Sequence, residues 1–246
     1  MMIPTIADYE FAIAPYVSGT AQTCSYCDHL SSLILLEGRH TYITMAIGQI
    51  VEGYTQICSQ RHRTAATGLY SDETRELVEM KQLLRAAYRI VYGTPGIAFE
   101  HGKAGSCLWG DQRPTNMKTL CYHTHVHFVP VDIDIRPAIE SILPDVIQVN
   151  SVDELKRVRT RVLEAEPYLY LEDTREVGYV YPVDDEVIPR QFLRTCVAQA
   201  LGVPEKADWM TFPGTELFGI VRSKLVPVLT ELAATMLTDY VRPISS

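Results

Sequence analysis

The sequence lacks the features of several large protein classes. No stretch approaches the roughly 20 consecutive apolar residues that a membrane-spanning helix needs. Basic residues are in the minority, because 22 Lys and Arg stand against 30 Asp and Glu and give a formal net charge of −8. A chain with this charge has no general attraction for nucleic acids or anionic lipids. We therefore expect neither a nucleic-acid polymer nor a membrane as a partner, and an anionic ligand needs a local cluster of donors.

Signals for export and for a disulfide framework are also missing. The N-terminal segment, MMIPTIADYE, contains no basic part followed by an apolar run, and we expect a cytoplasmic protein. Six cysteines in 246 residues are too few for a disulfide-rich scaffold. Closely spaced cysteines in a reducing compartment are typical of metal or redox ligands, which draws attention to Cys24 and Cys27.

The composition is that of a globular protein, with 47% hydrophobic and 21% charged residues and no repeat or low-complexity tract. A chain of 246 residues allows one large domain or two small ones. Pro130 and the Asp-rich stretch that follows it indicate a boundary. We predict one domain over residues 1–135 and an α+β extension over residues 136–246.

The hydrophobic pattern predicts an α+β fold. Residues 1–23 show little periodicity, and we expect an irregular lead-in there. Apolar residues recur at helical spacing between Ser71 and Val91, which predicts a long helix that ends at Gly93. Short apolar runs predict strands at residues 33–37, 41–46, 51–58, 96–102 and 120–131. In the extension we expect helices at residues 151–164, 189–201 and about 216–240, and a hairpin at residues 168–183.

Three of the seven histidines, His123, His125 and His127, alternate along one predicted strand. Side chains alternate between the two faces of a strand, so all three imidazoles project from the same face. Two chemical hypotheses follow: all three bind a catalytic metal, or one imidazole is a nucleophile that the others position. A neutral imidazole attacks phosphorus well when its other nitrogen donates to a fixed acceptor. A backbone carbonyl on a neighbouring strand could be that acceptor.

The segment HTHVHFV at residues 123–129 resembles the motif of the histidine triad (HIT) superfamily, in which three histidines alternate with apolar residues. Three earlier segments are also similar to parts of that superfamily: TCSYC at residues 23–27, SQRHR at residues 59–63 and GIAFEHG at residues 96–102. Their order along the chain is reproduced as well. The resemblance covers roughly residues 20–130.

The resemblance implies both a fold and an activity. The fold is an antiparallel sheet with a long helix packed on it, usually in a homodimer. The activity is hydrolysis or transfer of a nucleotidyl group from a nucleoside phosphate ester, anhydride or phosphoramidate. The resemblance assigns His125 as the nucleophile that forms a covalent nucleotidyl intermediate, and His127 as a donor of a hydrogen bond to the phosphate. A non-catalytic nucleotide-binding protein and a metalloenzyme with three ligating histidines are the alternatives.

A metal site is implied by the zinc-bearing members of the superfamily, in which the first histidine of the triad is a ligand. In this chain the implied ligands are Cys24, Cys27, His62 and His123. Two thiolates and two imidazoles form a closed tetrahedral zinc site, which is structural and not catalytic. Without the histidines, a redox pair would explain the two cysteines equally well.

Substrate-binding candidates lie at the end of one predicted strand and in the loop after it. These candidates are His101, Ser106 and Thr119. Leu120 occupies the position where the superfamily often has a serine that contacts the leaving group, so hydrolysis and transfer both stay open. In the extension, Gln191 and Arg194 on the helix that begins with IPRQFLR could point toward a phosphate or across a dimer interface.

Overall fold

The computed structural model describes most of the chain. The described residues are 4–21, 24–102, 123–150, 152–158, 167–183, 188–189 and 191–237. Within these ranges no helix has both the length and the apolar composition required to cross a membrane.

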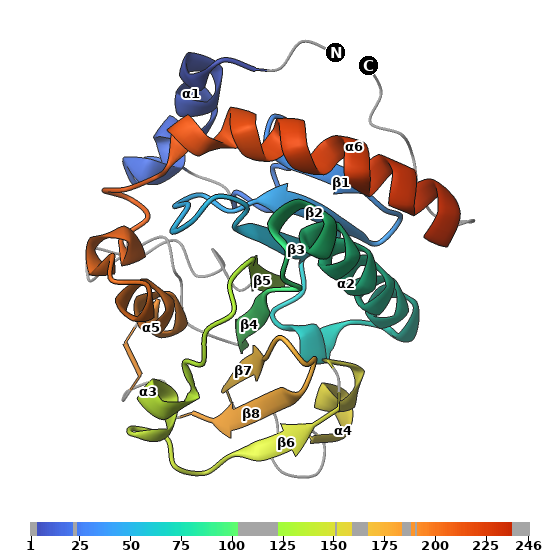
Figure 1. Ribbon diagram of the computed structural model, residues 1–246, viewed down its shortest axis with the longest axis vertical. Coiled ribbons are helices and arrows are strands. Elements are labelled where there is room, and N and C mark those ends of the chain that lie inside the picture. The colour runs from blue at the N-terminus through green and yellow to red at the C-terminus, as the bar shows by residue number, and fades with distance from the viewer. Residues whose placement is uncertain are drawn as a thin grey trace.

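An antiparallel sheet forms the centre of the described structure (Figure 1). Its eight described strands lie in the order β1-β2-β3-β5-β4-β7-β8-β6, and all neighbouring pairs are antiparallel. The strands are β1 (Ile34–Glu37), β2 (Thr41–Met45), β3 (Thr55–Ser59), β4 (Ile97–Gly102), β5 (His125–Val129), β6 (Ile147–Val149), β7 (Tyr168–Glu172) and β8 (Gly178–Pro182). The predicted α+β class with an antiparallel sheet is confirmed.

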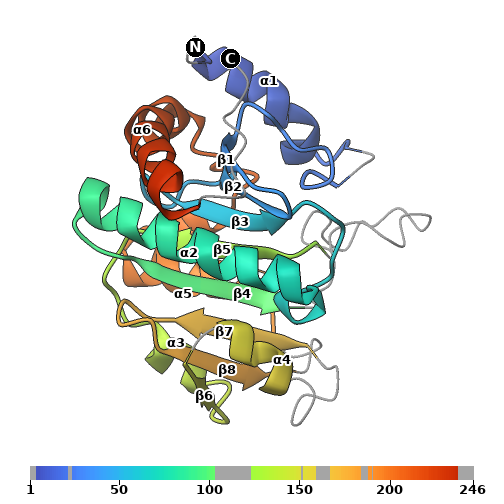
Figure 2. The same ribbon diagram turned by 90° about the vertical axis from the view of Figure 1, so that its right-hand side faces the viewer.

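Helices cover both faces of this sheet. The described α-helices are α1 (Ile6–Val17), α2 (Ser71–Tyr92), α3 (Arg136–Glu140), α4 (Leu155–Val158), α5 (Phe192–Ala200) and α6 (Phe218–Met236). Residues of α2 and α6 share one hydrophobic core with Val126 and Phe128 of β5. Residues of α3 and α5 share a second core with Phe99 of β4 on the opposite face. Figure 2 shows α2 in front of the sheet and α5 behind it.

The long helix α2 begins and ends where its sequence indicates. The carboxylate of Glu73 accepts a hydrogen bond of 2.7 Å from the backbone N–H of Tyr70, which satisfies a free donor at the helix start. Gly93 follows the helix with a φ of 75°, a left-handed conformation that glycine adopts without strain. The apolar residues from Leu77 to Ala87 that recur at helical spacing are buried in the core that α2 shares with the sheet, whereas Ile90 is exposed.

The expectation of an irregular lead-in was wrong, because residues 6–17 form α1. Thr5 and Asp8 form a capping box, in which each side chain accepts a hydrogen bond from the backbone of the other residue. Tyr9, Ile13 and Tyr16 are spaced at four and three residues and are buried. This spacing was a readable helix signal in an otherwise weakly patterned segment.

The predicted hairpin and the last two predicted helices correspond to β7 with β8, to α5 and to α6. Of the helix predicted at residues 151–164, residues 152–158 form a 3₁₀ turn and the short α4, and residues 159–166 lie outside the described part. The strand predicted at residues 51–58 begins only at Thr55, because Gly53 has a φ of 89° in the preceding turn.

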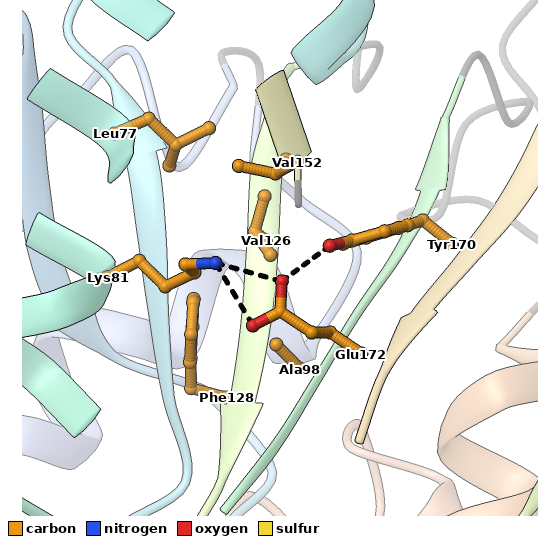
Figure 3. A pocket seen from close by; sticks show the side chains of 8 residues that line it. All are labelled: Leu77, Lys81, Ala98, Val126, Phe128, Val152, Tyr170 and Glu172. Carbon is orange, nitrogen blue, oxygen red and sulfur yellow. Dashed lines mark hydrogen bonds and ion pairs between the residues drawn. The ribbon is translucent and has the colours of Figure 1, made fainter. Parts of the chain in front are cut away.

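The extension continues the sheet that the first 135 residues begin. Strand β7 pairs with β4 along its whole length, and a buried ion network joins β7 to α2 (Figure 3). The carboxylate of Glu172 lies 2.7 Å from Nη2 of Arg85 and 3.0 Å from Nζ of Lys81, and Tyr170 donates to it. The division at residue 135 stays a prediction from the sequence, and the sheet runs across it.

Candidate functional site

The four residues implied as metal ligands come together beside strands β3 and β5. The ligand atoms of Cys24, Cys27, His62 and His123 all lie within 4.8 Å of one another. Sγ of Cys27 lies 3.2 Å from Nδ1 of His62 and 3.4 Å from Nδ1 of His123. A tetrahedral ion with bonds of about 2.0–2.3 Å places its ligand atoms about 3.5 Å apart. The group therefore has the donor set and the spacing to bind a metal ion.

The surroundings orient these donors toward one another. Nε2 of His123 lies 2.7 Å from the carbonyl oxygen of Ser59, so it carries the proton and leaves the Nδ1 lone pair facing the two thiols. Desolvation, and then the neighbouring Cys24, raises the pKa of the Cys27 thiol to about 12. A thiolate at this position therefore needs a cation beside it. A redox pair of cysteines would not account for the two imidazoles.

His125 has its protonation pattern fixed by the backbone that leads into its strand. Nδ1 of His125 lies 2.6 Å from the carbonyl oxygen of His123. A carbonyl only accepts, so Nδ1 carries the proton and Nε2 keeps its lone pair. A carbonyl on a neighbouring strand was a possible acceptor, but the carbonyl of Ser59 on β3 lies beside Nε2 of His123 and not beside His125. The ring of His125 stacks on Tyr26, with centroids 4.6 Å apart and an angle of 15° between planes.

His127 has the opposite pattern. Nδ1 of His127 lies 2.7 Å from the hydroxyl of Tyr54 and 3.2 Å from Nε2 of Gln56. The amide nitrogen of Gln56 is a donor, so Nδ1 of His127 is the acceptor and Nε2 carries the proton. The ring is held by Phe99 of β4, with centroids 4.8 Å apart and an angle of 16° between planes. His127 can therefore donate a hydrogen bond from Nε2.

The two imidazoles are adjacent and uncharged. Their ring centroids are 4.8 Å apart. Desolvation lowers the pKa of His125 to about 4, and desolvation followed by the charge of His125 lowers the pKa of His127 well below its usual value. Both rings are thus neutral near pH 7. The site presents one imidazole with a free lone pair beside one that carries an N–H donor, which suits attack on an anionic electrophile.

Of the three substrate-binding candidates, the structure describes only His101. His101 lies two positions after Phe99 on β4, on the same strand face, and its charge contributes to lowering the pKa of His125. Ser106 and Thr119 lie outside the described residues.

Three aromatic or amide side chains of the site were not predicted from the sequence. Tyr26, inside the Cys-x-x-Cys segment, stacks on His125, and Tyr54 and Gln56 set the tautomer of His127. The position of Tyr26 between two predicted metal ligands was a usable signal. Tyr54 and Gln56 carried none, because their roles depend on the pairing of β3 with β5.

Arg194 occupies neither of the two places expected from the sequence. Its guanidinium is buried and donates to the backbone carbonyls of Gly48, Lys206 and Ala207. Gln191 is also used locally: with its amide oriented to satisfy both ends, it donates to Ala207 and accepts from Trp209 Nε1. Both side chains therefore tie α5 to neighbouring loops.

Comparison with known proteins gives little support for assigning the chain to a family. No family model matches the chain, and no curated protein matches it. A hypothetical histidine triad nucleotide-binding protein from Sulfolobus tokodaii strain 7 is similar in structure over 44% of this chain and 68% of its own, with 14% identity and a TM-score of 0.33. A likeness at this level does not establish a family, so the function has to be inferred from the residues of the site.

Proposed function

We propose that the protein is a nucleotidyl hydrolase or transferase of the histidine triad type, which acts through a covalent nucleotidyl intermediate on His125. The observation that carries the proposal is the pair of complementary tautomers. His125 donates from Nδ1 to the carbonyl of His123 and keeps a lone pair on Nε2, while His127 accepts at Nδ1 and carries a proton on Nε2.

The reaction has two steps. Nε2 of His125 attacks the α-phosphorus of a nucleoside phosphate ester, anhydride or phosphoramidate, and a nitrogen–phosphorus bond forms as the bond to the leaving group breaks with its electron pair. The Nδ1–H bond to the carbonyl of His123 stabilises the imidazolium. Water, which releases a proton to the solvent, or another phosphate then attacks phosphorus, and the electron pair of the nitrogen–phosphorus bond returns to Nε2. His127 donates to a phosphate oxygen as charge develops in both steps.

A structural zinc ion fits the ligand group beside this pair. Cys24, Cys27, His62 and His123 would hold it, because two thiolates and two imidazoles are a donor set that zinc prefers. When bound, the ion supplies a crosslink between the Cys-x-x-Cys segment and the start of β5. Through Tyr26, that segment reaches the ring of His125.

The two other functions are less well supported by the geometry. In a metalloenzyme with three ligating histidines, His125 and His127 would face the same ion as His123. Among the described residues, however, the candidate ligand group includes only one of these three histidines, His123. The Nδ1 atoms of His125 and His127 form hydrogen bonds elsewhere. A nucleotide-binding protein without turnover remains an outcome of the test.

The proposal also includes the partners of the protein: a nucleotide or nucleotide conjugate as ligand, and a second copy of the chain in a homodimer.

The test is turnover on a panel of nucleotides and nucleotide conjugates by wild type and His125→Ala. Under the proposal the variant loses at least ~100-fold in kcat/KM, with the metal content unchanged. His40→Ala is the matched control, because His40 lies in the turn before β2 and pairs with Asp72 at 3.4 Å. Tight nucleotide binding without turnover would favour the binding protein, and loss of metal in His125→Ala would favour the metalloenzyme.

A further inference from the structure

A buried arginine of the extension lies beside Tyr54, one of the two residues that set the tautomer of His127. Arg194 of α5 is 6% exposed. Its Nη2 donates to the carbonyl of Gly48 at 3.0 Å, and its central guanidinium carbon lies 5.1 Å from the centroid of the Tyr54 ring. Gly48 allows this approach, since a Cβ there would lie 2.7 Å from Nη2 of Arg194. The extension therefore contacts the site from inside the core.

The charge on Arg194 constrains the hydroxyl of Tyr54. A guanidinium has donors and no acceptor. Burial raises the pKa of Tyr54, and the positive charge of Arg194 opposes that rise. A hydroxyl group beside a buried cation turns its oxygen toward the charge and its proton away from it. Nδ1 of His127 lies 2.7 Å from the Tyr54 hydroxyl and can accept that proton. The hydroxyl is thereby made the donor and the imidazole the acceptor.

We propose that Arg194 is a positioning residue of the histidine pair: acting through Tyr54, and together with the amide donor of Gln56, it holds His127 in the tautomer with the proton on Nε2. The catalytic meaning of this tautomer rests on the proposed function, whereas the tautomer itself is a property of the resting protein. Residues 136–246 thus have a specific part in the site, in addition to the strands that they add to the sheet.

The test is ¹⁵N NMR of the imidazole nitrogens in the metal-loaded full chain. We expect Nδ1 of His127 in wild type to be unprotonated and hydrogen-bonded. Tyr54→Phe removes the nearer of the two donors and leaves Gln56 at 3.2 Å, and Arg194→Gln introduces an amide oxygen that can accept from Tyr54. Both variants should therefore move the Nδ1 signal part of the way toward that of a free imidazole nitrogen. Arg194→Lys keeps a charged group that only donates and should retain the wild-type signal.

A matched control is available on the other face of the sheet. Arg222 of α6 is also buried, at 7% exposure, and donates to the carbonyls of Ser32 and Ile34. Arg222→Gln should leave the signals of His127 unchanged, even if it lowers stability. If an Arg194 variant shifted the His127 signals only because the whole fold was less stable, then Arg222→Gln would shift them as well.

Activity provides the second measurement. We expect formation of the nucleotidyl adduct to be about fivefold slower in Tyr54→Phe and Arg194→Gln, the factor expected from loss of one neutral hydrogen bond. A proton on Nδ1 of His127 in wild type would overturn the inference, as would a shifted signal in a folded Arg194→Lys or an unshifted one in Arg194→Gln. If no nucleotide yields an adduct but the NMR results hold, the proposed function fails and the tautomer control stands.

Discussion

The buried ion network between α2 and β7 predicts an unusual asymmetry among substitutions. Two cations, Arg85 and Lys81, share the one carboxylate of Glu172, and the side chains of these residues are at most 6% exposed. Glu172→Gln keeps the size of the side chain and an oxygen to accept from Tyr170, but it leaves two buried positive charges without a counterion. Breaking a buried ion pair in this way costs about 3–5 kcal/mol.

Lys81→Met should behave differently. It removes the excess cation, keeps a similar volume and leaves the pair of Arg85 and Glu172, which lie 2.7 Å apart, in balance. A substitution that conserves volume costs less than about 1.5 kcal/mol. Glu176→Gln is the surface control, because its partner Arg89 on α2 is half exposed and such pairs contribute about 0–1 kcal/mol.

Thermal and urea unfolding followed by circular dichroism measures these differences. For a chain of this size, 1 kcal/mol shifts Tm by about 2–4 °C, so Glu172→Gln should lower Tm by about 6–20 °C. Lys81→Met and Glu176→Gln should each shift it by no more than about 6 °C. Equal losses for Glu172→Gln and Lys81→Met would refute the reasoning, since they would show that the charge balance of the network does not matter.

Two further predictions concern a buried acid and the metal group. Desolvation raises the pKa of Glu100 from 4.5 to about 7, against the hydrogen bonds from Tyr168 and the backbone of Ala66. The folded state therefore binds the proton more tightly than the unfolded state, and this contribution is present in full below about pH 4.5 and is lost as the pH rises through about 7. Between pH 5 and 8 wild type should lose about 3 kcal/mol relative to Glu100→Gln, measured by urea unfolding, whereas a constant difference would contradict the assignment. Elemental analysis should find about one zinc per chain in wild type and in Cys196→Ser but none in Cys24→Ser, and a chelator should lower Tm only where zinc is present; native protein purified without metal would contradict this.

Much of the sheet and the long helix could be predicted because their signals are local. The apolar spacing after Ser71 and the stop at Gly93 fix α2, and short apolar runs separated by turns fix β1, β2 and β4. The lead-in was misjudged although Thr5 and Asp8 form a recognisable capping box. The spacing of its buried residues is just as local, so α1 was predictable from the sequence as well.

The site was predictable only in part, for a different physical reason. The four candidate metal ligands were predicted through a resemblance in the order of short motifs, and the structure brings them together. The acceptor for His125 depends on the course of its own backbone, and the partner of His127 depends on strand pairing. Arg194 reaches Gly48 from 146 positions away along the chain, a contact that no local pattern encodes.

The most direct test of the central claim is to trap the intermediate. Wild-type protein is mixed with each nucleotide conjugate, quenched rapidly and digested, and the peptides are weighed by mass spectrometry. We predict a nucleoside monophosphate attached to His125, present also in His40→Ala and absent in His125→Ala. An adduct on His127, or turnover by folded, metal-loaded protein in which His125 has been replaced, would contradict the claim.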